Sequence, residues 1–116
     1  MILDDIKNQL EKVDPRVYYG MVDDEVRETV WDYIVFNRTK LKSTGNKSGY
    51  ADGYDVHIVR ENFIPEGVDL DAIEKMQAIE GMRLASEDGD YNYIMKPNTN
   101  IVVEMLTLHF MRARKC

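Results

Sequence analysis

The sequence predicts an α+β fold, in which a mixed, mainly antiparallel β-sheet is packed by two helices. Six segments are rich in β-branched and aromatic residues, several of them alternating with polar residues at period two, as half-buried strands do. Two further segments repeat apolar residues at three and four positions, as amphipathic helices do. The predicted order is α-β-β-β-α-β-β-β, and we expect residues 1–116 to form a single domain.

The first helix is predicted over residues 2–13. Its apolar stripe consists of Ile2, Leu3, Ile6, Leu10 and Val13. We expect Asp14-Pro15 to end this helix, because the residue before a proline avoids helical backbone angles. A short strand is then predicted over residues 17–22.

Two alternating strands are predicted over residues 30–36 and 54–60, joined by a long basic loop at residues 37–53. Three glycines, at positions 45, 49 and 53, predict that this loop is mobile in the isolated protein. One interpretation is a solvated hairpin tip. The other is a loop that becomes ordered on an acidic partner. The candidate partner-binding residues are Arg38, Lys40, Lys42, Lys47 and Tyr50.

The second helix is predicted to follow residue 69, with a stripe of Leu70, Ile73, Met76 and Ile79. Asp69, or Asp71 together with Glu74, is the expected N-terminal cap, and Gly81 the expected stop. Strands over residues 82–86 and 91–95 flank a turn at 87–90. The last strand, over residues 101–111, is apolar on both faces and is therefore expected inside the sheet.

Composition excludes several classes of protein. The 116 residues are 44% hydrophobic and carry a net charge of −6, which argues against a general nucleic-acid binder. The apolar runs are shorter than the roughly 18 residues of a membrane span. Acidic residues follow Met1 where a signal peptide would carry basic ones, so we expect a cytoplasmic site of synthesis. The single cysteine, Cys116, excludes an internal disulfide and is expected to be an exposed thiol without a role.

The sequence contains no complete motif of a catalytic or metal-binding site, so we expect no active site. Phosphate-binding loops, zinc-type spacings and the Gly-x-Ser-x-Gly elbow are absent from the sequence. Asp88, Asp90 and Asn92 resemble part of a calcium loop, but the glycine position and the missing glutamate do not fit. Asp55 and His57 share a strand face and could form an acid–base couple, although a surface histidine beside an acid is common. We therefore expect no catalytic residue, no metal and no cofactor.

Acidic and basic residues gather in separate segments of the chain. Oppositely charged surface patches are usually only solvated, but they also suit head-to-tail contacts between identical copies of a protein. Seven tyrosines add residues that are favoured at protein interfaces. The candidate subunit-interface residues are the acids Asp23, Asp24, Glu25 and Glu28 and the bases Arg112 and Arg114.

The first helix is followed by the segments 17–20, 31–36 and 54–59, then by the glycine-ended second helix, the strand 91–93, and the strand 104–110 with its basic tail. The order and the sequences of these segments, which cover nearly the whole chain, resemble the tail terminator, or tail completion, family of long-tailed phages and prophages. The resemblance is a pattern of elements and not of catalytic residues. Cys116 is not part of the family pattern.

The resemblance implies a ring, usually of six copies, that seats on the last ring of the tail tube, ends tube polymerisation and offers the head a docking surface. The implied partners are further copies of the chain, the major tail tube protein and a head-completion or connector protein, with DNA passing through the lumen without sequence-specific recognition and no role for a membrane. The implied location is the tail–neck junction of the virion.

Three alternatives remain open at this point. The first is the head-closure family of the phage neck, which has a similar size. The second is a small enzyme that uses His57 or His109. The third is a monomeric, non-catalytic binding or regulatory module.

Overall fold

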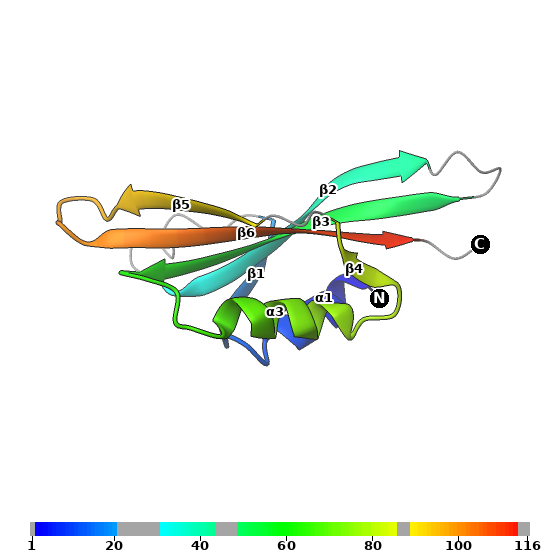
Figure 1. Ribbon diagram of the computed structural model, residues 1–116, viewed down its shortest axis with the longest axis horizontal. Coiled ribbons are helices and arrows are strands. Elements are labelled where there is room, and N and C mark those ends of the chain that lie inside the picture. Colours follow the sequence, from blue (N-terminus) through cyan, green and yellow to red (C-terminus); the bar gives the residue numbers. More distant parts are fainter. Residues whose placement is uncertain (1, 21–30, 44–48, 86–88, 114–116) are drawn as a thin grey trace.

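The computed structural model describes residues 2–20, 31–43, 49–85 and 89–113. Within these residues the chain forms two helices and a six-stranded, mostly antiparallel sheet, which confirms the predicted α+β class and element order. Both helices lie on the same side of the sheet (Figure 1). The elements are α1 (Ile2–Leu10), β1 (Val17–Tyr19), β2 (Tyr33–Ser43), β3 (Tyr50–Glu61), α3 (Val68–Gln77), β4 (Met82–Leu84), β5 (Asp90–Met95) and β6 (Val102–Ala113).

The sheet is organised around β6, which confirms the prediction of an interior strand. The strand order is β1-β2-β3-β6-β4, and β5 also pairs with β6. Antiparallel pairing with β3 runs from Ala113 back to Val103. On the opposite edge of β6, β5 pairs with residues 102–107 and β4 with residues 110–112. The strands β4 and β5 therefore lie one after the other along β6 and do not pair with each other, because β6 is long enough to bind both.

Among the described strands, β1 and β2 form the one parallel pair, with Val17 opposite Ile34. The strand β1 is shorter than predicted and ends at Tyr19, because Gly20 turns the chain with a φ of 81° that glycine adopts without strain. The next strand begins at Tyr33 and not at residue 30 as predicted. The acidic segment that was predicted to link them lies outside the described residues.

The prediction of a loop over residues 37–53 is wrong for most of that length. Pairing continues to Ser43 on β2 and starts at Tyr50 on β3, with a bulge between Arg38 and Lys40 (Figure 1). Hydrogen bonding to a neighbouring strand here overrides weak local strand propensity. Gly53 does not supply mobility: it sits in β3 beside the bulge, where a Cβ atom would collide with the Thr39 hydroxyl oxygen.

The main core lies between the helices and the sheet, and it contains the inward faces of both. Its fully buried members include Ile6 and Leu10 of α1 and Met76 of α3, which pack against Phe36, Tyr54, Val56, Ile58, Leu106, Leu108 and Phe110 of the sheet. A smaller cluster on the opposite face of the sheet consists of Trp31, Tyr33, Val59 and Val103. The sheet therefore carries buried apolar side chains on both faces.

The stripe predicted for the second helix needs correction. Leu70 is 68% exposed, Ile73 is partly buried, and Ala72 takes the fully buried place beside Met76. The predicted cap is also wrong: Gly67 holds the cap position with a φ of 92° and without a side-chain hydrogen bond. The helix begins at Val68 and ends at Gln77, and Gly81, at a φ of 81°, lies four residues beyond that end. The first helix ends at Leu10, three residues earlier than predicted.

An ion pair ties the loop after α1 to the sheet. Asp14 Oδ2 lies 2.6 Å from Arg60 Nη2, and both side chains are largely buried. The other carboxylate oxygen, Oδ1, accepts a hydrogen bond from the Arg16 backbone N–H at 2.9 Å. Asp14 therefore does more than precede a proline, which was the only role that the sequence predicted for it.

Candidate functional site

The strongest concentration of described cations lies on the hairpin arm, which we define as residues 37–43 of β2 with residues 50–55 of β3. Arg38, Lys40 and Lys42 all project from β2 as exposed side chains. No described carboxylate lies within ion-pair distance of any of the three. Tyr50, also half-exposed, starts the other strand of the arm. The structure thus places four predicted partner-binding residues on paired strands, with Lys40 and Lys42 on the face opposite the helices and Arg38 and Tyr50 on the other face. The fifth, Lys47, lies outside the described residues.

Two of these cations border an open pocket of about 360 Å³ on the sheet face opposite the helices. Its lining also includes Asp55 and His109 from the neighbouring strands. Strand register explains the grouping, because Lys40 lies opposite Gly53 on β3 and Met111 lies opposite Gly53 on β6, so that their side chains share this face. The pocket therefore joins the cationic arm to a polar network in the middle of the sheet.

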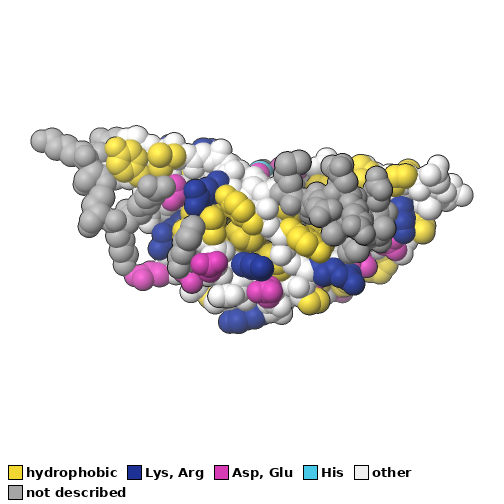
Figure 2. Space-filling view, turned by 180° about the vertical axis from the view of Figure 1, so that it is seen from behind, with side chains coloured by type: hydrophobic (Ala, Val, Ile, Leu, Met, Phe, Trp, Pro, Cys, Tyr) yellow, Lys and Arg dark blue, Asp and Glu magenta, His cyan; other side chains and the backbone are white. Residues whose placement is uncertain are grey.

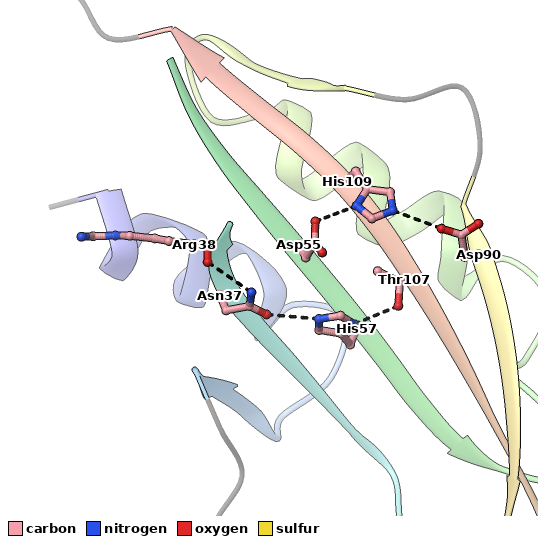
Figure 3. A network of polar contacts seen from close by, with 7 residues as sticks. All are labelled: Asn37, Arg38, Asp55, His57, Asp90, Thr107 and His109. Atoms are coloured by element: carbon pink, nitrogen blue, oxygen red, sulfur yellow. Dashed lines mark hydrogen bonds and ion pairs between the residues drawn. The ribbon is translucent and has the colours of Figure 1, made fainter. Parts of the chain in front are cut away.

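The polar network contains both histidines (Figure 3). A pair between Asp55 and His57, two residues away, was one possibility that the sequence left open. Instead, Asp55 Oδ1 lies 2.7 Å from His109 Nδ1, while His109 Nε2 lies 3.2 Å from Asp90 Oδ2. The reason is register: Asp55 stands directly opposite His109 on β6. Sequence spacing within one strand gave no sign of this cross-strand partner.

His57 has two uncharged partners. Its Nδ1 lies 2.9 Å from the hydroxyl oxygen of Thr107, and its Nε2 lies 3.1 Å from the side-chain oxygen of Asn37. The amide oxygen can only accept, so the Nε2–H of a neutral imidazole donates to Asn37 and Nδ1 accepts from Thr107. Neither nitrogen is left to act on a substrate without breaking one of these contacts.

The pKa values of the two histidines are shifted in opposite directions. Hydrogen bonds that His109 makes to the carboxylates of Asp55 and then Asp90 raise its pKa above the usual value, because they favour the charged imidazolium. Burial lowers the pKa of His57, against a smaller opposing effect of Asp55. One sheet face thus holds two imidazoles whose pKa values are shifted in opposite directions.

The candidate subunit-interface residues are only partly within the described structure. Arg112 lies near the end of β6, where its Nε donates to the backbone oxygen of Glu80 at 3.0 Å. This contact holds the side chain against the turn that follows α3. The remaining interface candidates, and Cys116, lie outside the described residues: Asp23, Asp24, Glu25, Glu28 and Arg114.

A surface that sequence reasoning did not locate is the strand β5, all six residues of which are exposed. Tyr91 and Tyr93 lie on the helix side, and Tyr93 is 60% exposed. A hydrogen bond to Glu104 raises the pKa of Tyr93, and burial together with Asp69 raises the pKa of Tyr91, so both phenols are neutral near pH 7. The signal in the sequence was the abundance of tyrosines, which did not say which of them are exposed.

The described residues contain no group of three or more His, Cys, Asp or Glu side chains that could hold a metal ion. No described helix is long and apolar enough to cross a membrane.

The sequence was compared with models of protein families and with curated proteins. Neither comparison finds a match.

Proposed function

We propose that this protein is a phage tail terminator. In this proposal six copies form a ring on the end of the tail tube, the ring stops tube polymerisation, and its far side offers the docking surface for the head. The partners are other copies of the chain, the tail tube protein and a head-completion or connector protein. The protein acts structurally at the tail–neck junction and needs no catalytic residue or cofactor.

The hairpin arm is the observation that carries the proposal. It extends β2 and β3 beyond the part of the sheet that the helices cover (Figure 1). Arg38, Lys40 and Lys42 stand on it without a described carboxylate within ion-pair distance. Charged side chains that the fold itself does not neutralise are suited to an external partner of opposite charge. The arm can therefore contact an acidic surface without any change in the core.

The element order and the charge distribution also support the proposal. The α-β-β-β-α-β-β-β order is the one that the family resemblance implies, although many functions share one fold. The acids at residues 23–28 and the bases near the end of β6 are far apart in the sequence. A ring needs two different complementary surfaces on each copy, because each copy meets its neighbours head to tail.

The test of the proposal removes charge from the arm and leaves the core intact. We replace Lys40 and Lys42 by Gln in a tail terminator complementation assay, with the tails measured by electron microscopy. Positive charge mainly raises the rate of encounter with an acidic partner, so the variant should yield overlong or headless tails. The matched control replaces Lys7 and Lys12, two exposed cations of the first helical segment, and should yield normal tails.

Thermal unfolding separates loss of function from loss of fold. The arm variant should unfold within about 0.5 kcal/mol of the original protein, as exposed substitutions usually do. Normal tails and full infectivity with the arm variant would refute the role of the arm. If the control pair gave the same defect, charge in general and not the arm would be responsible.

The charged contacts between neighbouring copies in the proposed ring can be tested by a second measurement. Exposed charge pairs are screened over about 8 Å at physiological ionic strength, so contacts between acidic and basic surfaces should weaken as salt rises. Sedimentation of the protein together with assembled tails, across salt concentrations, measures the number of copies retained. A single copy on each assembled tail would exclude a ring.

A further inference from the structure

The two edges of the sheet formed by the described strands differ in their charged residues and bulges. Beyond its pairing with β1 at residues 34–36, β2 runs on to Ser43 with three cations and a bulge, and no other described strand pairs with it there. Charged side chains and bulges are the usual protection of an edge strand against another chain. On the other side of the sheet, β4 and β5 are the outermost described strands, and residues 90–95 of β5 contain no Lys, Arg, Pro or bulge.

The backbone groups at the free edge of β5 can be identified from the hairpin that follows it. Lys96 donates its backbone N–H to the backbone oxygen of Ile101. In an antiparallel pair such hydrogen-bonded positions alternate, so residues 94, 92 and 90 also direct their backbone groups toward β6. The backbone N–H and C=O groups of Tyr91, Tyr93 and Met95 therefore face away from the sheet, where no other described strand pairs with them.

We propose that this edge pairs with the same edge of a second copy of the chain, antiparallel and around a two-fold axis at Tyr93. In this register, the numbers of any two residues that face each other across the two copies of β5 add up to 186. Tyr93 lies opposite Tyr93 of the second copy, and Tyr91 lies opposite Met95. These side chains are all about half or more exposed, so the contact covers apolar surface as well as backbone groups.

Charge complementarity favours this occupant and this register. Asp90, at the start of β5, falls opposite Lys96 of the second copy, and the two-fold axis repeats the pair at the other end. Asp90, Asn92, Ile94 and Lys96 alternate onto the sheet face opposite the helices, so the opposite charges meet on one side. No like charges fall opposite each other.

The two charged residues keep their present partners in the paired state. Asp90 uses Oδ2 toward His109, which leaves Oδ1, and its side chain is 65% exposed. Lys96 contacts Glu61 at 2.6 Å, and an ammonium group has three N–H donors. The proposed ion pair therefore adds to the contacts within each copy and does not compete with them.

This inference does not rest on the proposed tail function. The contact is two-fold and joins identical edges, whereas the ring joins two different surfaces head to tail. A six-residue strand gives a contact below the roughly 1,200 Å² of stable specific interfaces. We therefore expect a weak dimer whose population rises with protein concentration.

Engineered cysteines test the register directly in the purified full chain, with Cys116 replaced by Ser to remove the native thiol. Tyr93→Cys should form a disulfide with itself, because paired residues have Cα atoms about 5.5 Å apart. Asn92→Cys mixed with Ile94→Cys should form a mixed disulfide at least several-fold faster than either variant alone. The reason is that residues 92 and 94 lie opposite each other, whereas 92 lies about 7–8 Å from its own counterpart.

A substitution at the two-fold axis supplies an independent measurement. Tyr93→Lys places two cations opposite each other, and sedimentation at high concentration should show a monomer. The matched control is Tyr19→Lys, since Tyr19 is 48% exposed and not in β5; it should dimerise as the original does. Thermal unfolding should show both variants folded.

Three results would overturn the inference. One is a concentration series in which the original chain remains a monomer throughout. Another is equal cross-linking of Asn92→Cys with itself and with Ile94→Cys, which would indicate random collision. The last is a Tyr93→Lys variant that is folded and still dimeric.

Discussion

Asp55 and His109 lie directly opposite each other on β3 and β6, and 2.7 Å separates the Asp55 Oδ1 from the His109 Nδ1. The residues are 54 positions apart in the sequence. With Asp90 on the other ring nitrogen, His109 connects β3, β6 and the first residue of β5 (Figure 3). The protonation of one side chain thus influences how three strands are held together.

This arrangement predicts a pH dependence of stability. The pKa of His109 is higher in the folded protein than in the unfolded chain, where it is about 6.5. The stability that protonated His109 contributes is therefore complete below about pH 6.5 and is lost as the pH rises through the pKa of His109 in the folded protein. His109→Gln should abolish this loss. Urea unfolding of both proteins between pH 5 and 9 measures how the free energy of unfolding depends on pH. If that free energy changed with pH equally in both proteins above pH 6.5, the prediction would be wrong.

His57 should produce the opposite dependence and serves as the comparison. Burial lowers its pKa in the folded protein, so the unfolded chain takes up the proton first as pH falls. The stability that neutral His57 contributes is complete above about pH 6.5 and is lost as the pH falls through the pKa of His57 in the folded protein. His57→Gln should therefore flatten the acid side of the same stability curve.

The revised helix stripe predicts a graded series of substitutions in α3. Met76 is fully buried, and Met76→Ala should lower the free energy of unfolding by roughly 2–5 kcal/mol. Ile73→Ala should cost less because Ile73 is only partly buried, and Leu70→Ala should stay within about 0.5 kcal/mol. Denaturant unfolding gives the three values. A Leu70 variant as damaging as the Met76 variant would restore the stripe predicted from the sequence.

The ion pair between Asp14 and Arg60 predicts a large loss when one partner is removed. Both side chains are mostly buried, so Asp14→Ala leaves a buried cation without its partner and should cost roughly 3–5 kcal/mol. The double variant Asp14→Ala/Arg60→Met removes both charges and should recover part of that loss. Lys96→Ala, which breaks a more exposed pair, should cost at most about 1 kcal/mol.

The close approach of Thr39 to Gly53, at the bulge of the hairpin arm, can be tested by a substitution and a second substitution that compensates for it. Gly53→Ala places a methyl group against the Thr39 hydroxyl and should lower the free energy of unfolding by roughly 1–3 kcal/mol. Thr39→Ala in the same chain removes the colliding oxygen and should restore most of the loss. If the second substitution restored nothing, the effect of Gly53→Ala would come from another contact, such as Met111.

Local patterns were sufficient to predict the class and the order of the elements, since alternation and helical spacing need no knowledge of distant residues. Element ends were predicted less well. Residues 37–43 have loop-like composition, yet their backbone pairs with β3, and β3 in turn pairs with β6. A distant strand therefore decides the structure of residues whose own propensities predict a loop.

The candidate site shows the same limit. The cations of the arm could be named from the sequence because charge is a property of single residues. The partner of Asp55 could not, because it depends on the register between strands that are far apart in the sequence. The exposure of β5 likewise follows from its position on the outer edge of β6 and not from its alternating pattern.

The central position of β6 also bears on how the chain is made. The ribosome synthesises residues 102–113 after all the strands that pair with them, so β3, β4 and β5 each have an open edge until β6 emerges. Those edges attract other chains and chaperones. We expect the sheet to form only after residue 113 has left the ribosomal exit tunnel: nascent chains stalled before residue 102 should be cut rapidly by protease, and chains with residue 113 outside the tunnel should resist it. Incomplete synthesis would then leave no partly folded copy able to take a place in an assembly.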